Sequence, residues 1–492
     1  MKSLYVNSHY AVNQTVHASV LSDDQCREIV SSAIEVLERT GADVFDEKAL
    51  KLFADNGCWV EGNRVRIPSG LTEWAINTAP SRVVLADRDG KRKLFLEGSN
   101  SYYGPGPTNT YFIDPFTSER RKPLKEDKVN VAKVCDALPN IDYVMDLGTA
   151  SNVTANLADV HAFQAMLLNT TKPIVHWGFG IEQYEDIVNM CIAIAGSLEK
   201  LQQAPFIALY SESSPPGLHS SEGIGKAMWV AEKGLPLVYT PCVMAGATAP
   251  ATMAGTLVQS LAESFIGLVA SQLIRKGTPF ILGGVIAIMD MKSTILSYGS
   301  AEFHLLQGAM ANLGQYMKIP VFGTAGCTDA KTLDGQAAIE SSLSIMMAAS
   351  MGANLVHDVG YTEYGATGSL FQVVLGDEII GYVKRIMRGI EVTDETLALD
   401  IIDNVGPGGH FLGEMHTMQN FKKETWFPTL IDRTRYDEWK MKGGLSMGDR
   451  IKAKTQDIIN QHQPKQLCAD VVEKINQIVA GAEAREAAKA KK

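Results

Sequence analysis

The chain has 492 residues, an apolar content of 46% and a net charge of −10 at pH 7. The acidic balance argues against a nucleic-acid-binding surface, and the apolar runs are too short and interrupted to span a bilayer. Seven scattered cysteines without a CxxC pair argue against a disulfide framework, so we expect a cytoplasmic protein.

Residues 1–125 predict an α+β N-terminal extension. A helix is expected over residues 22–40, because Ser22 can cap it and apolar residues then recur with a helical period. The patterns that follow predict a helix over 46–57, a hairpin turning at Gly62–Asn63, a helix over 69–78 and strands over 82–90 and 92–98. Residues 101–123 alternate glycine and proline with aromatic residues, which suits either a rigid ligand loop or a turn-rich linker.

Residues 126–390 alternate strand and helix patterns, as expected of a (β/α)8 barrel. The expected strands cover residues 142–150, 172–180, 204–213, 235–243, 278–287, 318–326 and 352–360, with an eighth near 369–376. These runs are continuously apolar, which indicates a parallel sheet covered on both faces. A doubly wound sheet is the alternative, but no GxGxxG follows the first strand. Residues 391–492 predict a helical C-terminal extension packed on the barrel.

Active sites of such barrels lie at the C-terminal ends of the strands. The residues expected there are Trp177, Tyr210, Glu212, Thr240, Met244, Thr248, Gly283, Asp329, His357, Asp358, Tyr361 and Gln372. Each also has a structural explanation: His357 could be a core histidine, and Asp329 a helix cap.

Three kinds of catalytic site lack their patterns. The sequence has no HxH pair that would indicate a metal site, no GxSxG motif that would indicate a nucleophile, and no P-loop that would bind a phosphate. The remaining aromatic and small residues suit a ligand held by aromatic faces, such as a quaternary ammonium ion.

Six stretches in chain order resemble the trimethylamine methyltransferase superfamily, and specifically its members without pyrrolysine. They are residues 41–68, IDPFTSERRKP (113–123), AGATAPATMAGTLVQSLAESFIGLV (245–269), TDAKTLDGQAAIE (328–340), GANLVHDVGY (352–361) and GPGGHFLGEMHTMQNF (406–421). The resemblance implies a TIM barrel that demethylates a methylated amine and passes the methyl group to Co(I) of a separate corrinoid protein. Pyrrolysine-containing members carry that residue in the segment matching residues 334–340, which here reads DGQAAIE. The implied substrate is therefore a quaternary amine of the glycine betaine, proline betaine, carnitine or γ-butyrobetaine class.

The resemblance also implies roles for individual residues. The cation cage is expected from Tyr103, Trp177, Tyr210, Tyr361 and Phe371; His357 would bind a substrate carboxylate; Asp329, Gln336 and Glu340 would shape the pocket; and Gly246, Thr248, Gly408 and His410 would face the corrin ring. The expected cobalamin belongs to the partner protein, and no tightly bound cofactor, metal, membrane or nucleic acid is expected on this chain. A homo-oligomer is expected. A metal-dependent barrel hydrolase and a non-catalytic quaternary-amine-binding protein are the alternatives.

Overall fold

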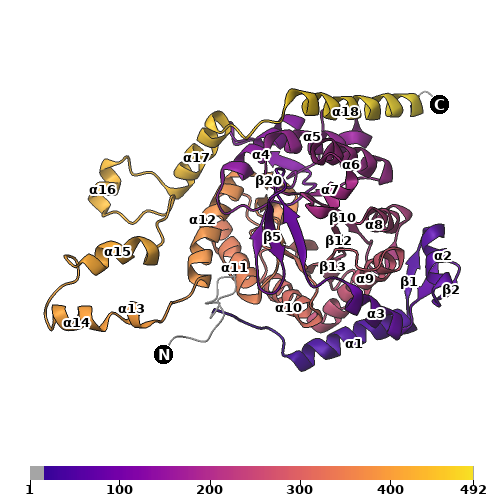
Figure 1. The fold of residues 1–492 in the computed structure, drawn as a ribbon, viewed down its shortest axis with the longest axis horizontal. Coiled ribbons are helices and arrows are strands. Elements are labelled where there is room, and N and C mark those ends of the chain that lie inside the picture. The colour runs from indigo at the N-terminus through magenta and orange to yellow at the C-terminus, as the bar shows by residue number, and fades with distance from the viewer. Residues whose placement is uncertain (1–15, 491–492) are drawn as a thin grey trace.

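A parallel β-barrel surrounded by helices forms the centre of the computed structural model, which describes residues 16–490 (Figure 1). Seven strands pair in the order β6-β18-β17-β14-β12-β10-β9. Their bounds are Tyr102–Tyr103 (β6), Leu355–His357 (β18), Val321–Thr324 (β17), Phe280–Gly283 (β14), Leu237–Thr240 (β12), Ile207–Glu212 (β10) and Ile174–Trp177 (β9). Val144 pairs with Ile174 of β9, and the Asp142 amide donates to the Tyr103 carbonyl of β6 at 2.6 Å. The segment around Val144 therefore closes the ring as its eighth member.

The prediction of an eighth barrel strand over residues 369–376 is wrong. Those residues begin helix α12 (Leu370–Met387), whose N-cap Ser369 accepts a hydrogen bond from the Gln372 amide. The apolar run is continuous because α12 is buried on most sides, and periodicity alone cannot separate such a helix from a buried strand. β6 takes the place in the barrel that residues 369–376 were expected to fill, and it precedes residue 126. The domain boundaries at residues 125 and 390 remain a prediction.

The helical layer consists mainly of eight helices. They are α4 (Lys125–Ala137), α5 (Ala158–Asn169), α6 (Ile181–Ala195), α8 (Ser221–Lys233), α9 (Met253–Ile274), α10 (Ala301–Met317), α11 (Gly335–Met351) and α12, with the short α7 (Leu198–Gln203) following α6. α9 is long and apolar enough to cross a membrane, but 78% of its apolar window is buried inside the protein. This burial explains the apolar sequence of α9 as that of a core helix.

Short strands extend the C-terminal rim of the barrel. They form two small sheets, β13-β15-β16 (Cys242–Ala245, Val285–Asp290, Ile295–Ser297) and β19-β20-β7-β8 (Tyr361–Thr362, Thr367–Ser369, Tyr111–Ile113, Arg120–Arg121). β13, β15 and β19 each follow a barrel strand almost directly, so the chain continues past the barrel before it turns into a helix.

The predicted N-terminal helices and strands are confirmed. α1 (Asp23–Arg39) starts at a capping box on Ser22, α2 covers Glu47–Asp55, β2 and β3 (Trp59–Glu61, Arg64–Arg66) form the hairpin, and α3 covers Ser69–Thr78. Two further strands, β1 (Ala42–Val44) and β11 (Leu218–His219), join the β2-β3 hairpin in one sheet. The hairpin β4-β5 (Val83–Ala86, Arg92–Leu96) supplies Val83, Leu85, Leu94 and Leu96 to the apolar cluster inside the barrel.

The C-terminal region divides into an arm and two returning helices. The arm, residues 390–445, projects away from the barrel and carries α13 (Asp394–Leu397), α14 (Leu399–Val405), α15 (Met415–Glu424) and α16 (Tyr436–Met441) (Figure 1). α17 (Met447–Gln461) packs on α12 and α4, and α18 (Ala469–Lys489) packs on α5 and α6.

Candidate functional site at the barrel mouth

Alternate residues of the barrel strands point inward, as the period of a β-strand requires. The interior cluster contains Tyr143, Tyr210 and Phe322 with partly buried Tyr102 and Trp177 packed against it. Tyr102 thus points into the barrel, whereas Tyr103 belongs to the apolar layer between the barrel and its helices. Tyr103 is therefore not placed with Trp177 and Tyr210 in the barrel interior.

Trp177 and Tyr210 meet at a carboxylate near the C-terminal ends of β9 and β10. Trp177 Nε1 donates to Glu212 Oε1 at 3.1 Å, and the Tyr210 hydroxyl donates to Glu212 Oε2 at 3.2 Å. Burial, followed by the adjacent Glu212 charge, raises the pKa of Tyr210 well above its usual value, so the phenol stays protonated. Both aromatic rings are thereby held next to a negative charge, an arrangement that attracts a cation.

A second carboxylate follows β18. Asp358 Oδ1 lies 2.6 Å from Nδ1 of His357, whose Nε2 lies 3.1 Å from Thr324 Oγ1. The His357 ring also stacks on Phe322, with centroids 3.9 Å apart and planes at 13°. His357 is 3% exposed, and both its nitrogens are already engaged. It is thus placed to orient Asp358 rather than to bind a substrate carboxylate directly.

The backbone around Asp358 is shaped to hold this carboxylate in place. Asp358 has φ = 74°, a left-handed conformation that aspartate tolerates better than most residues. Gly106 passes so close that a Cβ there would lie 2.0 Å from Asp358 Oδ1 and 2.5 Å from the Tyr361 ring. The glycine of the 101–123 loop therefore makes room for Asp358 and Tyr361.

Three more tyrosines surround this region. The Tyr361 hydroxyl donates to the Pro107 carbonyl, and its ring meets Tyr298 edge-on, with centroids 6.2 Å apart. Burial, followed by the Asp358 charge, raises the pKa of both phenols well above the usual value. Tyr143 is fully buried and its hydroxyl has no hydrogen-bond partner within residues 16–490, so a polar donor inside the barrel is left for a ligand.

Cys242 begins β13 and lies within the electrostatic reach of both carboxylates. Its side chain is exposed, yet burial, then the charges of Glu212 and Asp358, raise the pKa of its thiol to about 12. A thiol with this pKa is protonated at neutral pH and unsuited to nucleophilic attack.

The residues expected to shape the pocket support its rim. Asp329 accepts from Ser297 Oγ at 2.5 Å and from the Tyr298 amide at 2.9 Å. Glu340 accepts from Thr328 Oγ1 at 2.5 Å, from the Asp329 amide at 2.8 Å and from Gln336 Nε2 at 2.8 Å. Asp329 thus positions Tyr298, and Glu340 fixes the loop that carries Asp329.

Other expected residues lie elsewhere. Phe371 lines an outer hollow of about 330 Å³ beside the start of α17. Gly246 and Thr248 belong to the turn after β13, where Thr248 Oγ1 accepts from the Met244 amide at 2.9 Å. Gly408 and His410 lie on the arm, which projects away from this barrel (Figure 1).

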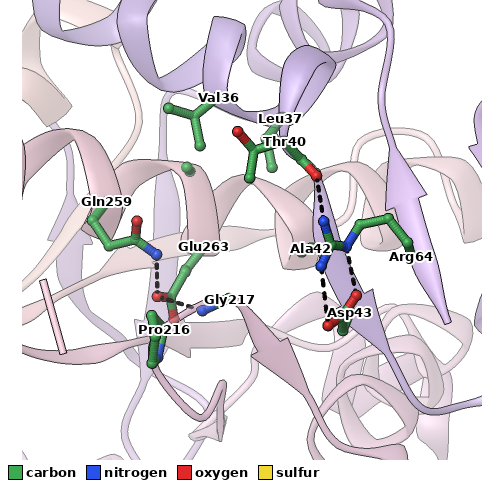
Figure 2. A pocket seen from close by; sticks show the side chains of 12 residues that line it. Val36, Leu37, Thr40, Ala42, Asp43, Arg64, Pro216, Gly217, Gln259 and Glu263 are labelled. Carbon is green, nitrogen blue, oxygen red and sulfur yellow. Dashed lines mark hydrogen bonds and ion pairs between the residues drawn. The ribbon is translucent and has the colours of Figure 1, made fainter.

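A further hollow, of about 160 Å³, lies between α1, β1 and α9 (Figure 2). Its polar groups bind one another: Glu263 accepts from Gln259 at 2.7 Å and from the Gly217 amide at 3.0 Å, while Arg64 pairs with Asp43. Because these groups already bind one another, the hollow is best explained as part of the contact between the N-terminal extension and the barrel.

The sequence patterns assigned no role to several residues at the mouth of the barrel. Glu212 and Asp358 are among the expected strand-end residues but have no role there; counting two residues on from inward Tyr210 assigns Glu212 to the barrel interior. Tyr143 and Tyr298 carried no comparable signal, since Tyr143 lies near the start of a barely formed strand and Tyr298 follows a rim hairpin. Within the part of the chain that is described, no three His, Cys, Asp or Glu side chains are grouped to hold a metal ion.

Comparisons with known proteins agree over nearly the whole chain. A family model described as trimethylamine methyltransferase (MTTB) matches residues 2–487. The chain is 33% identical to trimethylamine methyltransferase MttB of Desulfitobacterium hafniense, strain DSM 10664 / DCB-2, covering 93% of this chain and 92% of that protein. It is 32% identical to a glycine betaine methyltransferase of Desulfitobacterium hafniense, strain Y51, covering 94% and 96%. The solved monomethylamine methyltransferase of Methanosarcina barkeri matches with a TM-score of 0.48 at 11% identity, over 93% of this chain and 91% of that one.

Proposed function

Because the chain belongs to the trimethylamine methyltransferase family, we propose that it takes a methyl group from a quaternary amine and transfers it to Co(I) of a corrinoid carried by a separate protein. The observation that supports this proposal most directly is the pairing of aromatic rings with two carboxylates, Glu212 and Asp358, at the C-terminal mouth of the barrel. A quaternary ammonium ion donates no hydrogen bonds, so aromatic faces and nearby negative charge are the means of holding it. The relative named glycine betaine methyltransferase supports this substrate class.

The reaction makes modest demands on the protein. The N–CH3 bond breaks with its electron pair staying on nitrogen, the methyl carbon bonds to cobalt, and the amine leaves as a neutral tertiary amine. No proton has to reach the leaving group. The protein must orient one methyl group toward the acceptor and exclude water. Trp177 and Tyr210 would hold the cation on one side, with Tyr298 and Tyr361 on the other.

His357 acts in this proposal as a positioning residue. Because the carboxylate of Asp358 only accepts hydrogen bonds, His357 Nδ1 must donate to it. Thr324 can then donate to Nε2 and fix the neutral tautomer. The ring, clamped further by Phe322, would hold Asp358 beside the substrate nitrogen.

Tyr143 is the candidate for recognising a polar group on the substrate. Its hydroxyl is the unpartnered donor of the interior cluster, and a substrate carboxylate or hydroxyl would satisfy it. Tyr143→Phe should therefore weaken turnover of glycine betaine while leaving tetramethylammonium, which has no such group, unchanged. Equal effects on both compounds would remove Tyr143 from substrate recognition.

The central experiment supplies reduced cobalamin and a panel of amines, and follows methylcobalamin by absorbance. Tetramethylammonium, choline, glycine betaine, carnitine, γ-butyrobetaine and trimethylamine make up the panel. We expect turnover with at least one quaternary amine and none with trimethylamine. Turnover of trimethylamine alone would overturn the proposed substrate class, and binding of a quaternary amine without methyl transfer would indicate a binding protein instead.

A further inference from the structure

The arm, residues 390–445, carries an unusual concentration of exposed apolar side chains. Of the 28 large hydrophobic residues recorded as exposed within residues 16–490, 15 lie on it. They are Ile390, Val392, Leu397, Leu399, Ile402, Phe411, Leu412, Met415, Met418, Phe421, Phe427, Ile431, Tyr436, Met441 and Leu445. Monomeric soluble proteins seldom expose apolar surface on this scale unless it binds something.

The helices of the arm also lack support from their own chain. α13, α14, α15 and α16 have 4, 7, 10 and 6 residues, and none of the four contains a buried residue. Isolated helices shorter than about 12 residues are marginal in water, because tertiary packing supplies most of their stability. Such short helices need a surface to lie on.

Contacts with the barrel hold the arm mainly at its stem. The Glu378 carboxylate of α12 accepts from the amides of Leu430 and Ile431 at 2.8 and 3.0 Å. Trp426 meets Tyr382 of α12 edge-on, with ring centroids 5.4 Å apart. These contacts fix where the arm leaves the barrel, while its outer helices remain uncovered (Figure 1).

We propose that the arm embraces a second copy of this chain in a two-fold exchange, and that the other copy's arm covers α11 and α12 of this one. Exposed apolar side chains on those two helices offer the counterpart: Ile339 and Leu343 on α11, and Ile386 on α12. In a two-fold pair the same patches meet twice, so each copy both gives and receives an arm.

Charge and area favour this occupant. Residues 391–414 hold six acidic side chains and no Lys or Arg, whereas residues 415–445 hold six basic and four acidic ones. The acidic segment of one copy's arm would therefore meet the basic C-terminal end of the other copy's α12, where Lys384, Arg385 and Arg388 lie. Fifteen half-exposed apolar side chains present on the order of 1,000 Å², which is in the range of a stable interface. Interfaces of this apolar character are typical of permanent homo-oligomers, whereas partners that dissociate at each turnover use more polar ones.

The test measures the mass of the full chain in solution by size-exclusion chromatography with light scattering, together with hydrogen exchange of the arm. Wild type should be a dimer or a larger assembly of dimers, with slow exchange in α15. The double variant Leu412→Glu/Met418→Glu, at positions 87% and 71% exposed, should become monomeric and exchange fast in the arm, with an unchanged barrel. The matched control Phe45→Glu/Phe116→Glu, also exposed but off the arm, should keep the wild-type mass.

A monomeric wild type would overturn the proposal, as would an oligomer that the Leu412/Met418 variant leaves intact. The surface that the arm covers is tested by Ile339→Glu/Leu343→Glu, which should also reduce the mass. If only the arm variant dissociates the oligomer, the assignment of α11 as the covered surface fails. Circular dichroism of each variant shows whether the barrel has folded.

Discussion

Replacing Glu212 by Gln removes one negative charge from the barrel mouth while keeping the shape of the side chain. A unit charge roughly 5 Å from an ammonium ion, at an effective dielectric constant of about 20, contributes about 3 kcal/mol. The amide oxygen of Gln restores part of this attraction, so we expect a net loss of about 1.4 to 2.8 kcal/mol, or roughly 10- to 100-fold.

The loss should fall on KM rather than on kcat. Positive charge leaves the nitrogen as the methyl group departs, so the carboxylate stabilises the bound substrate more than the transition state. Glu212→Gln should therefore raise KM for a quaternary amine roughly 10- to 100-fold and leave kcat unchanged or slightly higher. Calorimetric binding of tetramethylammonium, without any methyl acceptor, should weaken by a similar factor.

Glu363→Gln provides the control for this experiment. Glu363 is a rim carboxylate of similar burial, but it pairs with Arg120 at 2.8 Å instead of facing the aromatic rings. It should leave both KM and tetramethylammonium binding near wild type. If Glu212→Gln bound the cation as tightly as wild type, the reasoning that places the cation beside Trp177 and Tyr210 would be refuted.

Substitutions at three further positions probe the surroundings. His357→Ala should lower kcat/KM at least 10-fold and His357→Asn should restore part of it, since an amide can still donate to Asp358; equal losses in both would contradict the positioning role. Gly106→Ala should abolish activity in a folded protein, because its Cβ would occupy the space of Asp358 Oδ1; full activity would contradict this packing. Burial lowers the pKa of Lys128 to about 8 from an ordinary 10.5, so the folded state disfavours its protonated form and wild-type stability should rise between about pH 8 and 10.5. In denaturant titrations at about pH 8 and pH 10, Lys128→Met should lack that rise; a variant whose stability still rose over this range would contradict it.

The barrel was predictable because its strands are apolar, continuous and separated by helices of ordinary length. Barrel strand β6 was not, because its two residues, followed at once by Gly104 and Pro105, leave almost no pattern to read, and the buried start of α12 imitates a strand. Once the wrong segment is assigned, no pattern marks Tyr102–Tyr103 as part of the sheet. Closure of the ring, which depends on pairing between distant segments, supplies the missing information.

The candidate site was predictable only as far as strand ends mark it. Trp177 and Tyr210 were recognised because each ends an apolar run, but the choice of Tyr103 over Tyr102 required the register of β6 against β18. A shift of one residue exchanges the inner and outer faces of a strand. His357 was recognised as a candidate, but its expected contact with substrate did not anticipate that Thr324 and Asp358 occupy both nitrogens.

The segment Asp334–Glu340 connects the geometry of the rim to the choice of substrate. Asp334 caps α11, accepting from the Gln336 and Ala337 amides, and Glu340 accepts two hydrogen bonds from the adjacent loop and one from Gln336 of α11. Its polar side chains are therefore committed to structure, and none is an electrophile or an unengaged acid that could assist a leaving amine. Methyl transfer at this mouth is best suited to a substrate that brings its own positive charge and departs without a proton, which is the chemistry of a quaternary amine.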